Sequence, residues 1–218
     1  MVDGRKNYTS TSPKSYWKKI GHQKLGSGQE TDNLTISWSG TYPSIKVIGT
    51  FLADGGSIVA NMTFNNNTDS NSYSKSYQDQ FNGADDDTQD LESLTGIFEA
   101  SSYETYFVAH IGNMASAEKT AWIESVKKTA TGTGSAVEHR ELIGKWSGTA
   151  NLTRIDIDNQ SGASGQFGEG SEWVVLGAMT SDAVADNNPK LPNGAIFEES
   201  DTGKHYMFDG TSAWNEMV

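Results

Sequence analysis

Apolar and polar side chains alternate at every second position in many short segments of this 218-residue sequence. The clearest segments cover residues 34–38, 58–64 and 105–111. Because successive side chains of a β-strand point to opposite faces, this period of two predicts strands that each bury one face. About eight to ten such segments can be distinguished, and their long connections favour a jelly-roll order over a meander. We therefore predict an all-β protein built as a jelly-roll-like antiparallel β-sandwich.

The composition agrees with a sandwich and excludes several other classes of protein. The chain contains 23 glycines, which suit tight turns, and 10% aromatic residues, which can fill the space between two sheets. It has no cysteine, so neither a disulfide framework nor a thiolate metal site can form. Its formal net charge is -12, whereas nucleic-acid binding needs a cluster of positive charge. We therefore expect no nucleic-acid partner.

Some segments give more specific predictions. Residues 172–177 are continuously apolar, which predicts a strand buried on both faces. The polar segment 65–90 predicts a long loop around one strand at 73–81, with left-handed turns among its asparagines. A short helix is compatible with residues 114–120. Strand periodicity continues after it at four alternate positions: Trp122, Glu124, Val126 and Lys128.

Composition also divides the chain into four parts. Residues 1–15 predict an extended polar arm, 16–180 the jelly-roll sandwich, 181–193 a linker, and 194–218 a small C-terminal β-hairpin unit. In that unit Gly203 can take the positive φ that a tight hairpin loop demands. Because a lone hairpin cannot bury its own apolar surface, we predict a homo-oligomer, with a trimer as the leading expectation. The candidate assembly residues are Ile196, Phe197, Tyr206, Phe208 and Trp214.

The sequence also bears on localisation. No apolar stretch follows the charged N-terminal residues, and no window approaches the roughly 18 apolar residues of a membrane helix. We therefore predict synthesis in a host cytoplasm, no membrane insertion, and release by a route such as incorporation into a particle.

Two regions of the sequence contain motifs of a recognisable kind. The first is formed by Phe64-Asn65-Asn66-Asn67, Asp69, Asn71 and Tyr73. It resembles the F-N-G-D-x-x-x-N-Y segment of small jelly-roll domains in phage tail-fibre, head-fibre and other virion proteins, with Asn66 in the glycine position. Residues 150–157 and 170–177 match the late strand and the closing Gly-Ser segment of that family. Residues 194–214 resemble a hairpin module at the ends of phage structural proteins. The resemblance implies a virion surface protein, as a head decoration, fibre or tail component that contacts other virion proteins.

Aromatic residues near amides suggest a further partner. Exposed rings can stack on the apolar face of a sugar while neighbouring amides and carboxylates bind its hydroxyls. If exposed, such residues predict attachment to host-surface glycans; alternatively, the tyrosines pack inside the sandwich or in a subunit interface. The candidates are Tyr73, Tyr77, Tyr103, Tyr106 and Asn71.

Metal-binding and catalytic signatures are weak. The acidic run 85–92 could offer Asp85, Asp87 and Asp90 to Ca²⁺, but it lacks the spacing of a calcium-binding loop, so a solvated acidic loop is the alternative. No other cofactor is predicted, because the histidines form no zinc signature and no nucleophile or phosphate-loop motif occurs. With 28 acidic residues, a chance carboxylate pair is no evidence for a glycosidase. We predict a non-enzymatic protein, with a stand-alone carbohydrate-binding module and a small glycan hydrolase as alternatives.

Overall fold

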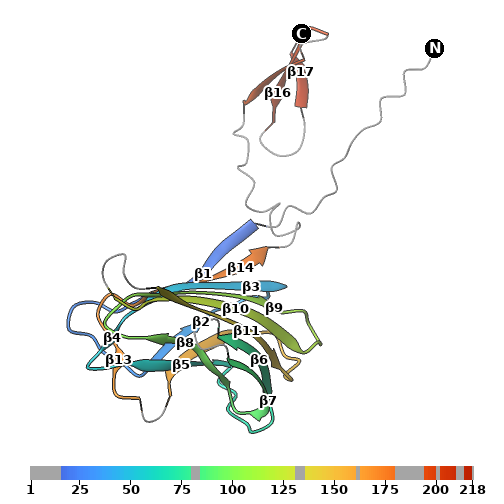
Figure 1. Ribbon diagram of the computed structural model, residues 1–218. Helices are drawn as coiled ribbons and strands as arrows, with labels where there is room; N and C mark the ends of the chain where they lie inside the picture. Colours follow the sequence, from blue (N-terminus) through green and yellow to red (C-terminus); the bar gives the residue numbers. More distant parts are fainter. Residues whose placement is uncertain are drawn as a thin grey trace. The chain divides into compact units, whose positions relative to one another are not determined.

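The computed structural model describes residues 16–79, 84–130, 136–160, 163–179, 194–199, 202–209 and 214–217. Every regular element in these ranges is a β-strand, and none of the described residues form a helix long and apolar enough to cross a membrane (Figure 1). Residues 15–179 form one compact unit, and the C-terminal strands belong to a second.

The larger sheet of the first unit contains eight strands. They are β1 (Tyr16–Lys24), β3 (Ser44–Phe51), β6 (Tyr73–Asp79), β7 (Ala84–Leu91), β9 (Thr105–Gly112), β10 (Lys119–Lys128), β11 (Val137–Trp146) and β14 (Glu172–Met179). Their order across the sheet is β1-β14-β3-β9-β10-β11-β6-β7, and every neighbouring pair is antiparallel.

The smaller sheet contains four strands. They are β2 (Asn33–Ser37), β5 (Ile58–Phe64), β8 (Leu94–Ala100) and β12 (Arg154–Asn159), and their order is β2-β12-β5-β8. Two short strands, β4 (Ala53–Asp54) and β13 (Gln166–Phe167), pair with each other at the side of the sandwich. Figure 1 shows the two larger sheets lying face to face as two layers.

The strand order is that of a jelly roll. Eight strands are divided between the two sheets, with β1, β3, β9 and β14 in one sheet and β2, β5, β8 and β12 in the other. They are arranged as β1-β14-β3-β9 and β2-β12-β5-β8, the order of two interlocked Greek keys. The hairpins β6-β7 and β10-β11 extend the first sheet beyond β9. The predicted all-β, jelly-roll-like sandwich is therefore confirmed.

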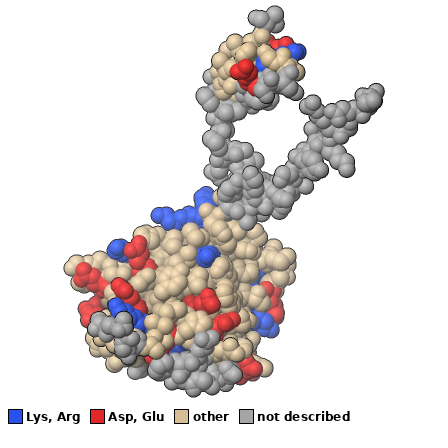
Figure 2. Space-filling model, turned by 45° about the horizontal axis from the view of Figure 1, so that its top comes forward, with Lys and Arg blue, Asp and Glu red and all other residues tan. Residues whose placement is uncertain are grey.

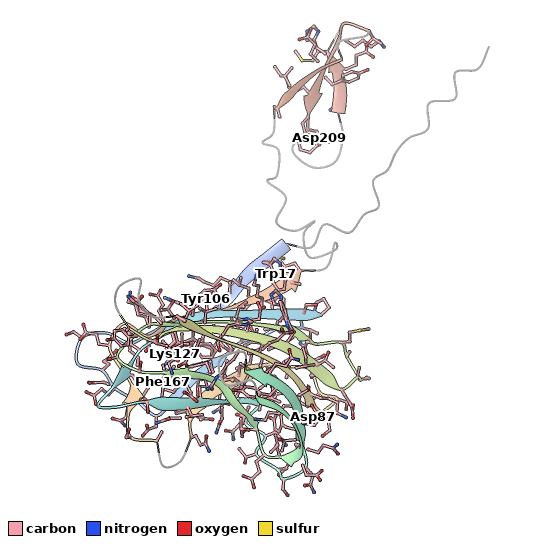
Figure 3. All side chains as sticks on the ribbon, in the orientation of Figure 1. Trp17, Asp87, Tyr106, Lys127, Phe167 and Asp209 are labelled. Atoms are coloured by element: carbon pink, nitrogen blue, oxygen red, sulfur yellow. The ribbon has the colours of Figure 1, made fainter. Side chains whose placement is uncertain are left out.

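Aromatic side chains fill the centre of the sandwich. The ring of Phe51 stacks on Phe98 with centroids 4.6 Å apart, and Phe107 and Phe167 lie within 6.1 Å of it. All four rings are fully buried, and Figure 3 shows Phe167 between the two layers. Burying each such side chain stabilises the fold by about 1.5–3 kcal/mol, so this cluster holds the two sheets together.

The asparagine-rich loop after β5 closes on Tyr73. The Tyr73 hydroxyl accepts a hydrogen bond from the Phe64 N–H (2.9 Å) and donates one to the Asn67 carbonyl (3.0 Å). Burial raises the pKa of this hydroxyl, which therefore remains a donor. The segment that resembles phage jelly-roll domains is thus a structural element of this fold. Three of its residues adopt left-handed φ, as predicted: Asn65 (53°), Asn66 (57°) and Asn71 (71°).

Two predictions about local structure were wrong. The acidic segment predicted as a loop contains β7, because an edge strand is held by backbone pairing with β6 and needs no apolar alternation. The helix compatible with residues 114–120 is absent: the chain turns at Ser116 (φ 58°), and β10 begins at Lys119. Lys119 is fully buried and bonds to carbonyls of that turn, which fixes the turn conformation.

Burial on the larger sheet also differs from the sequence prediction. Trp173 and Val175 of β14 are buried, whereas Val174 and Leu176 are only half-buried, because the smaller sheet covers one face of the larger sheet. The continuous apolar run is therefore not buried on both faces. On β10 the buried positions are 119, 121, 123 and 125, so the predicted alternation at Trp122 lies on the other, exposed face.

The second unit is a small antiparallel sheet. Its strands are β15 (Ile196–Glu199), β16 (Lys204–Phe208) and β17 (Trp214–Met217), in that order. Gly203, between β15 and β16, has the predicted positive φ (68°). The C-terminal hairpin is confirmed, and the strand that begins at Trp214 extends it to three strands.

Candidate functional site

Large apolar side chains are exposed on the outer face of the eight-stranded sheet. Their strand neighbours point into the core, so the pleat directs these side chains to solvent. Figure 3 shows Trp17 and Tyr106 standing on the side of the sheet away from the smaller sheet. Figure 2 shows mostly uncharged residues across the middle of this side, with charged groups scattered among and around them. Six exposed residues define this outer face: Trp17, Tyr106, Trp122, Val126, Val137 and Ile143.

Trp122 lies in the middle of the outer face and is held by two neighbours. His110 on β9 is its cross-strand partner, and the two rings lie 5.4 Å apart at 31°. The indole N–H donates a hydrogen bond to Oε1 of Glu141 at 2.9 Å. The ring remains 38% exposed. These contacts fix the orientation of an accessible aromatic surface before any partner arrives.

Burial lowers the pKa of the His110 imidazole, and the positive charge of Lys46 lowers it further, while Glu124 acts in the opposite direction. His110 is therefore neutral near pH 7. The aromatic pair with Trp122 consequently adds no positive charge to the outer face.

Two depressions meet beside Trp122. One, of about 350 Å³, is lined by Trp17, His110 and Trp122. The other, of about 550 Å³, runs over β11, β6 and β7 and is lined mainly by polar side chains. Thr120 and Ile143 line both, so the depressions form one continuous trough. Its polar lining includes Asn71, Ser74, Ser76, Asp87, Gln89 and Lys145.

Sequence reasoning missed the aromatic end of this trough. Trp122 is followed by Ile123, and either could have faced the core, so periodicity alone does not show which is exposed. The pairing of Trp122 with His110 depends on the register of two strands separated by a turn. The sizes of the side chains did give a signal. Ala121, Ile123 and Ser125 are small or medium in size, which suits the tightly packed space between two sheets.

Tyr73 cannot bind a glycan as predicted. Its ring is 2% exposed and packs with Phe64 and Trp146, and its hydroxyl is used within the loop. A buried ring offers no face to a sugar, so this assignment is corrected to a core role. Tyr73 belongs both to the motif that resembles phage domains and to the predicted glycan residues, and in the structure it packs in the core.

The other glycan candidates are dispersed. Tyr77 is half-buried on the core side of β6, with the Lys75 ammonium 5.4 Å and the Arg140 guanidinium 5.8 Å from its ring. Tyr103 is half-buried in a loop. Tyr106 is 48% exposed on the outer face, and Asn71 is exposed at the trough. The structure thus brings only Asn71 beside the trough and leaves Tyr106 elsewhere on the same face.

The candidate calcium ligands lie along β7. Asp87 and Asp90 are exposed, and Asp90 has a left-handed φ of 58°, while the side chain of Asp85 lies outside the described residues. Within the ranges that the structure describes, no three His, Cys, Asp or Glu side chains form a group that could hold a metal ion.

The candidate assembly residues lie in the second unit. Ile196 is 62% exposed, and Tyr206 and Phe208 are half-buried. Backbone pairing places Phe197 opposite Tyr206 and Trp214 opposite Phe208, but the side chains of Phe197 and Trp214 lie outside the described residues. Met207 and Met217 are also exposed, so this small sheet presents apolar surface to solvent.

The outer face of the smaller sheet is polar. Arg154 forms three hydrogen bonds to the Asp156 carboxylate, and Thr35 donates a fourth. Asp158 follows on the same face and accepts a hydrogen bond from the Asn33 amide. Burial and the nearby Asp156 charge raise the pKa of Asp158 to about 6, although Arg154 and Asn33 partly offset this.

We predict that Asp158→Asn stabilises the protein at pH 7 by about 1 kcal/mol. The pKa shift alone corresponds to roughly 3 kcal/mol, reduced here because the group is only half buried. Because the folded-state pKa is raised, the carboxyl keeps its proton to higher pH in the folded protein than in the unfolded chain. Its contribution to stability therefore falls as pH rises from about 4 to above 6. Urea unfolding at pH 4 and pH 7 measures this, and a variant whose advantage does not grow with pH would contradict it.

The sequence was compared with protein families and with curated proteins. The sequence matches no protein-family model and no curated protein. A function is therefore inferred from the fold and from the chemistry of the outer face.

Proposed function

We propose that this protein is a non-enzymatic surface component of a virus particle, as a head decoration, fibre or tail protein. The observation that carries the proposal is that six large apolar side chains are exposed on one face of the jelly roll. Large apolar side chains gathered on one face in this way mark a contact with a partner. The resemblance of residues 64–73 and 194–214 to phage structural modules supports a virion as the place of that contact.

The half of the outer face around Tyr106 suits contact with another copy of the chain. Tyr106 pairs across the strands with Val126, and the next row contains Val174, Ile48 and Val108. The Val174 row is apolar over β14, β3 and β9 and ends in Glu124 and Glu141 on β10 and β11. The Tyr106 row continues to Thr50 on β3 and Glu172 on β14. An apolar centre with a charged rim is the usual anatomy of a protein interface. We therefore propose a homo-oligomer that uses this half of the face.

Val126→Glu is expected to weaken self-association at least tenfold. Val126 is 37% exposed in the apolar row, so the substitution removes apolar contact and places a charge where the interface would exclude water. Light scattering over a concentration series measures the change. The control is Ser37→Glu, at an exposed position of the smaller sheet opposite Arg154, which should leave association unchanged. A full-length protein that stays monomeric at high concentration would refute self-assembly.

The C-terminal unit can be tested in the same way. A chain that ends at residue 193 lacks the exposed Ile196, Met207 and Met217. If the unit contributes to association, as we propose, the truncated chain should dissociate at higher concentration than the full chain. A truncated chain with an unchanged oligomeric state would remove this unit from the assembly contact.

A further inference from the structure

The trough beside Trp122 joins an aromatic depression to a polar one. Its 350 Å³ end is aromatic and its 550 Å³ end is polar, and the depression of about 440 Å³ at Tyr106 and Val126 shares no lining residue with it. Ligand sites commonly have volumes of about 300–1,000 Å³ and combine apolar walls with a few placed polar groups. The trough therefore has the dimensions of a small-ligand site.

The aromatic end presents a fixed ring surface. Trp122 is held by the His110 ring at 5.4 Å and by its hydrogen bond to Glu141 at 2.9 Å. Little side-chain entropy is then lost when a ligand packs on the indole, which favours binding. Trp17 lines the same depression from β1. A planar, weakly polar ligand face, such as that of a pyranose ring, fits such a surface.

The polar end carries groups that bind hydroxyls. Ser74 and Ser76 project from alternate positions of β6, and Asn71 and Gln89 lie at the neighbouring strand ends. Hydroxyls and amides both donate and accept, as the hydroxyls of a sugar require. The trough thus joins an apolar stacking surface to a hydroxyl-binding surface across Thr120 and Ile143.

The charges of the trough select against anionic ligands. Asp87 and Asp90 line its polar end. The ammonium of Lys145 lies 3.3 Å from the Glu118 carboxylate, and that of Lys75 donates to the Thr95 carbonyl at 3.0 Å. Both of these cations are engaged by the protein, and although Lys46 lies beside His110 at the aromatic end, the chain as a whole has a net charge of -12. A sialylated or sulfated glycan would meet repulsion, while a neutral one would not.

We propose that this trough binds a neutral glycan of at least two sugars, with one pyranose ring on Trp122 and the hydroxyls of a further sugar toward Ser74, Ser76 and Asn71. The inference rests on the proposed surface role, for which it names the ligand class. The site uses one of the predicted glycan residues, Asn71, together with an aromatic pair that alternation in the sequence did not reveal. Tyr106 lies outside the trough and belongs to the proposed protein contact.

The test is titration of the full chain with neutral oligosaccharides of hexose and N-acetylhexosamine, and with sialylated and sulfated ones, by calorimetry. We expect saturable binding of at least one neutral oligosaccharide and none of the anionic ones. Trp122→Ala should weaken binding about tenfold or more, while Trp122→Phe should retain most of it because a ring remains. Tyr106→Ala, an exposed aromatic on the same face, is the matched control and should bind normally.

The other outcomes separate this inference from the proposed function. Equal binding by Trp122→Ala and the original chain, or a preference for anionic glycans, would overturn the glycan site. If no glycan binds but Trp122→Ala weakens self-association as Val126→Glu does, the trough is part of the protein contact: the glycan site fails and the proposed assembly role survives. Melting curves of each variant confirm that the fold is intact.

Discussion

Replacing Lys119 with alanine is expected to lower the free energy of unfolding by about 3–5 kcal/mol. The side chain is fully buried at the start of β10. Its ammonium donates to the carbonyls of Met114 (2.7 Å), Ala117 (2.6 Å) and Thr149 (3.2 Å). Alanine would leave three carbonyls without this donor and a cavity between two loops. Guanidinium unfolding followed by tryptophan fluorescence measures the loss.

Two further variants separate the causes. Lys119→Met fills most of the space without the hydrogen bonds, so its loss should be smaller than that of alanine by roughly the cavity contribution. Lys145→Ala is the matched surface control, because that ammonium is half exposed and paired with Glu118, and it should change stability by less than about 0.5 kcal/mol. A loss below about 1 kcal/mol for Lys119→Ala would show that water can replace the ammonium.

Most of the sandwich could be predicted because its strands bury one face each. The buried residues of β5 are Ile58, Ala60, Met62 and Phe64. The polar residues Asn61 and Thr63 between them identify the opposite face of the strand. β7 could not be predicted in this way. It is an edge strand of acidic and polar residues, and its position depends on backbone bonds to β6, which leave no period in the sequence.

The exposed face could not be predicted from alternation because apolar residues occur on both faces of the larger sheet. Val174 and Leu176 on β14 and Trp122 on β10 look like core residues in the sequence. The position of the smaller sheet, which covers one face of the larger one, decides which set is buried. Conversely, Tyr73 looked like a ligand-binding residue because its neighbours are polar, yet its hydroxyl closes the loop that those neighbours form.

The second large effect is expected at Asn65, where Asn65→Ala should lower the free energy of unfolding by about 3 kcal/mol. Its side-chain oxygen accepts hydrogen bonds from the backbone N–H groups of Thr153 (2.9 Å) and Arg154 (3.2 Å), and its amide donates to the Asn151 carbonyl (2.9 Å). The side chain therefore joins the end of β5 to the segment that leads into β12. Its φ of 53° adds a cost for alanine that asparagine tolerates better.

The neighbouring Asn66 provides a matched control for the backbone term. It has a similar φ of 57° and an exposed side chain, so Asn66→Ala should cost only about 1 kcal/mol. Asn65→Gly removes the side chain and relieves the left-handed strain, so its loss should lie between those of the two alanine variants. Hydrogen exchange adds a local readout, because the amides of Thr153 and Arg154 should lose protection only in the Asn65 variants. Equal losses for Asn65→Ala and Asn66→Ala would show that the side-chain bridge contributes nothing, and that backbone conformation alone makes this loop stable.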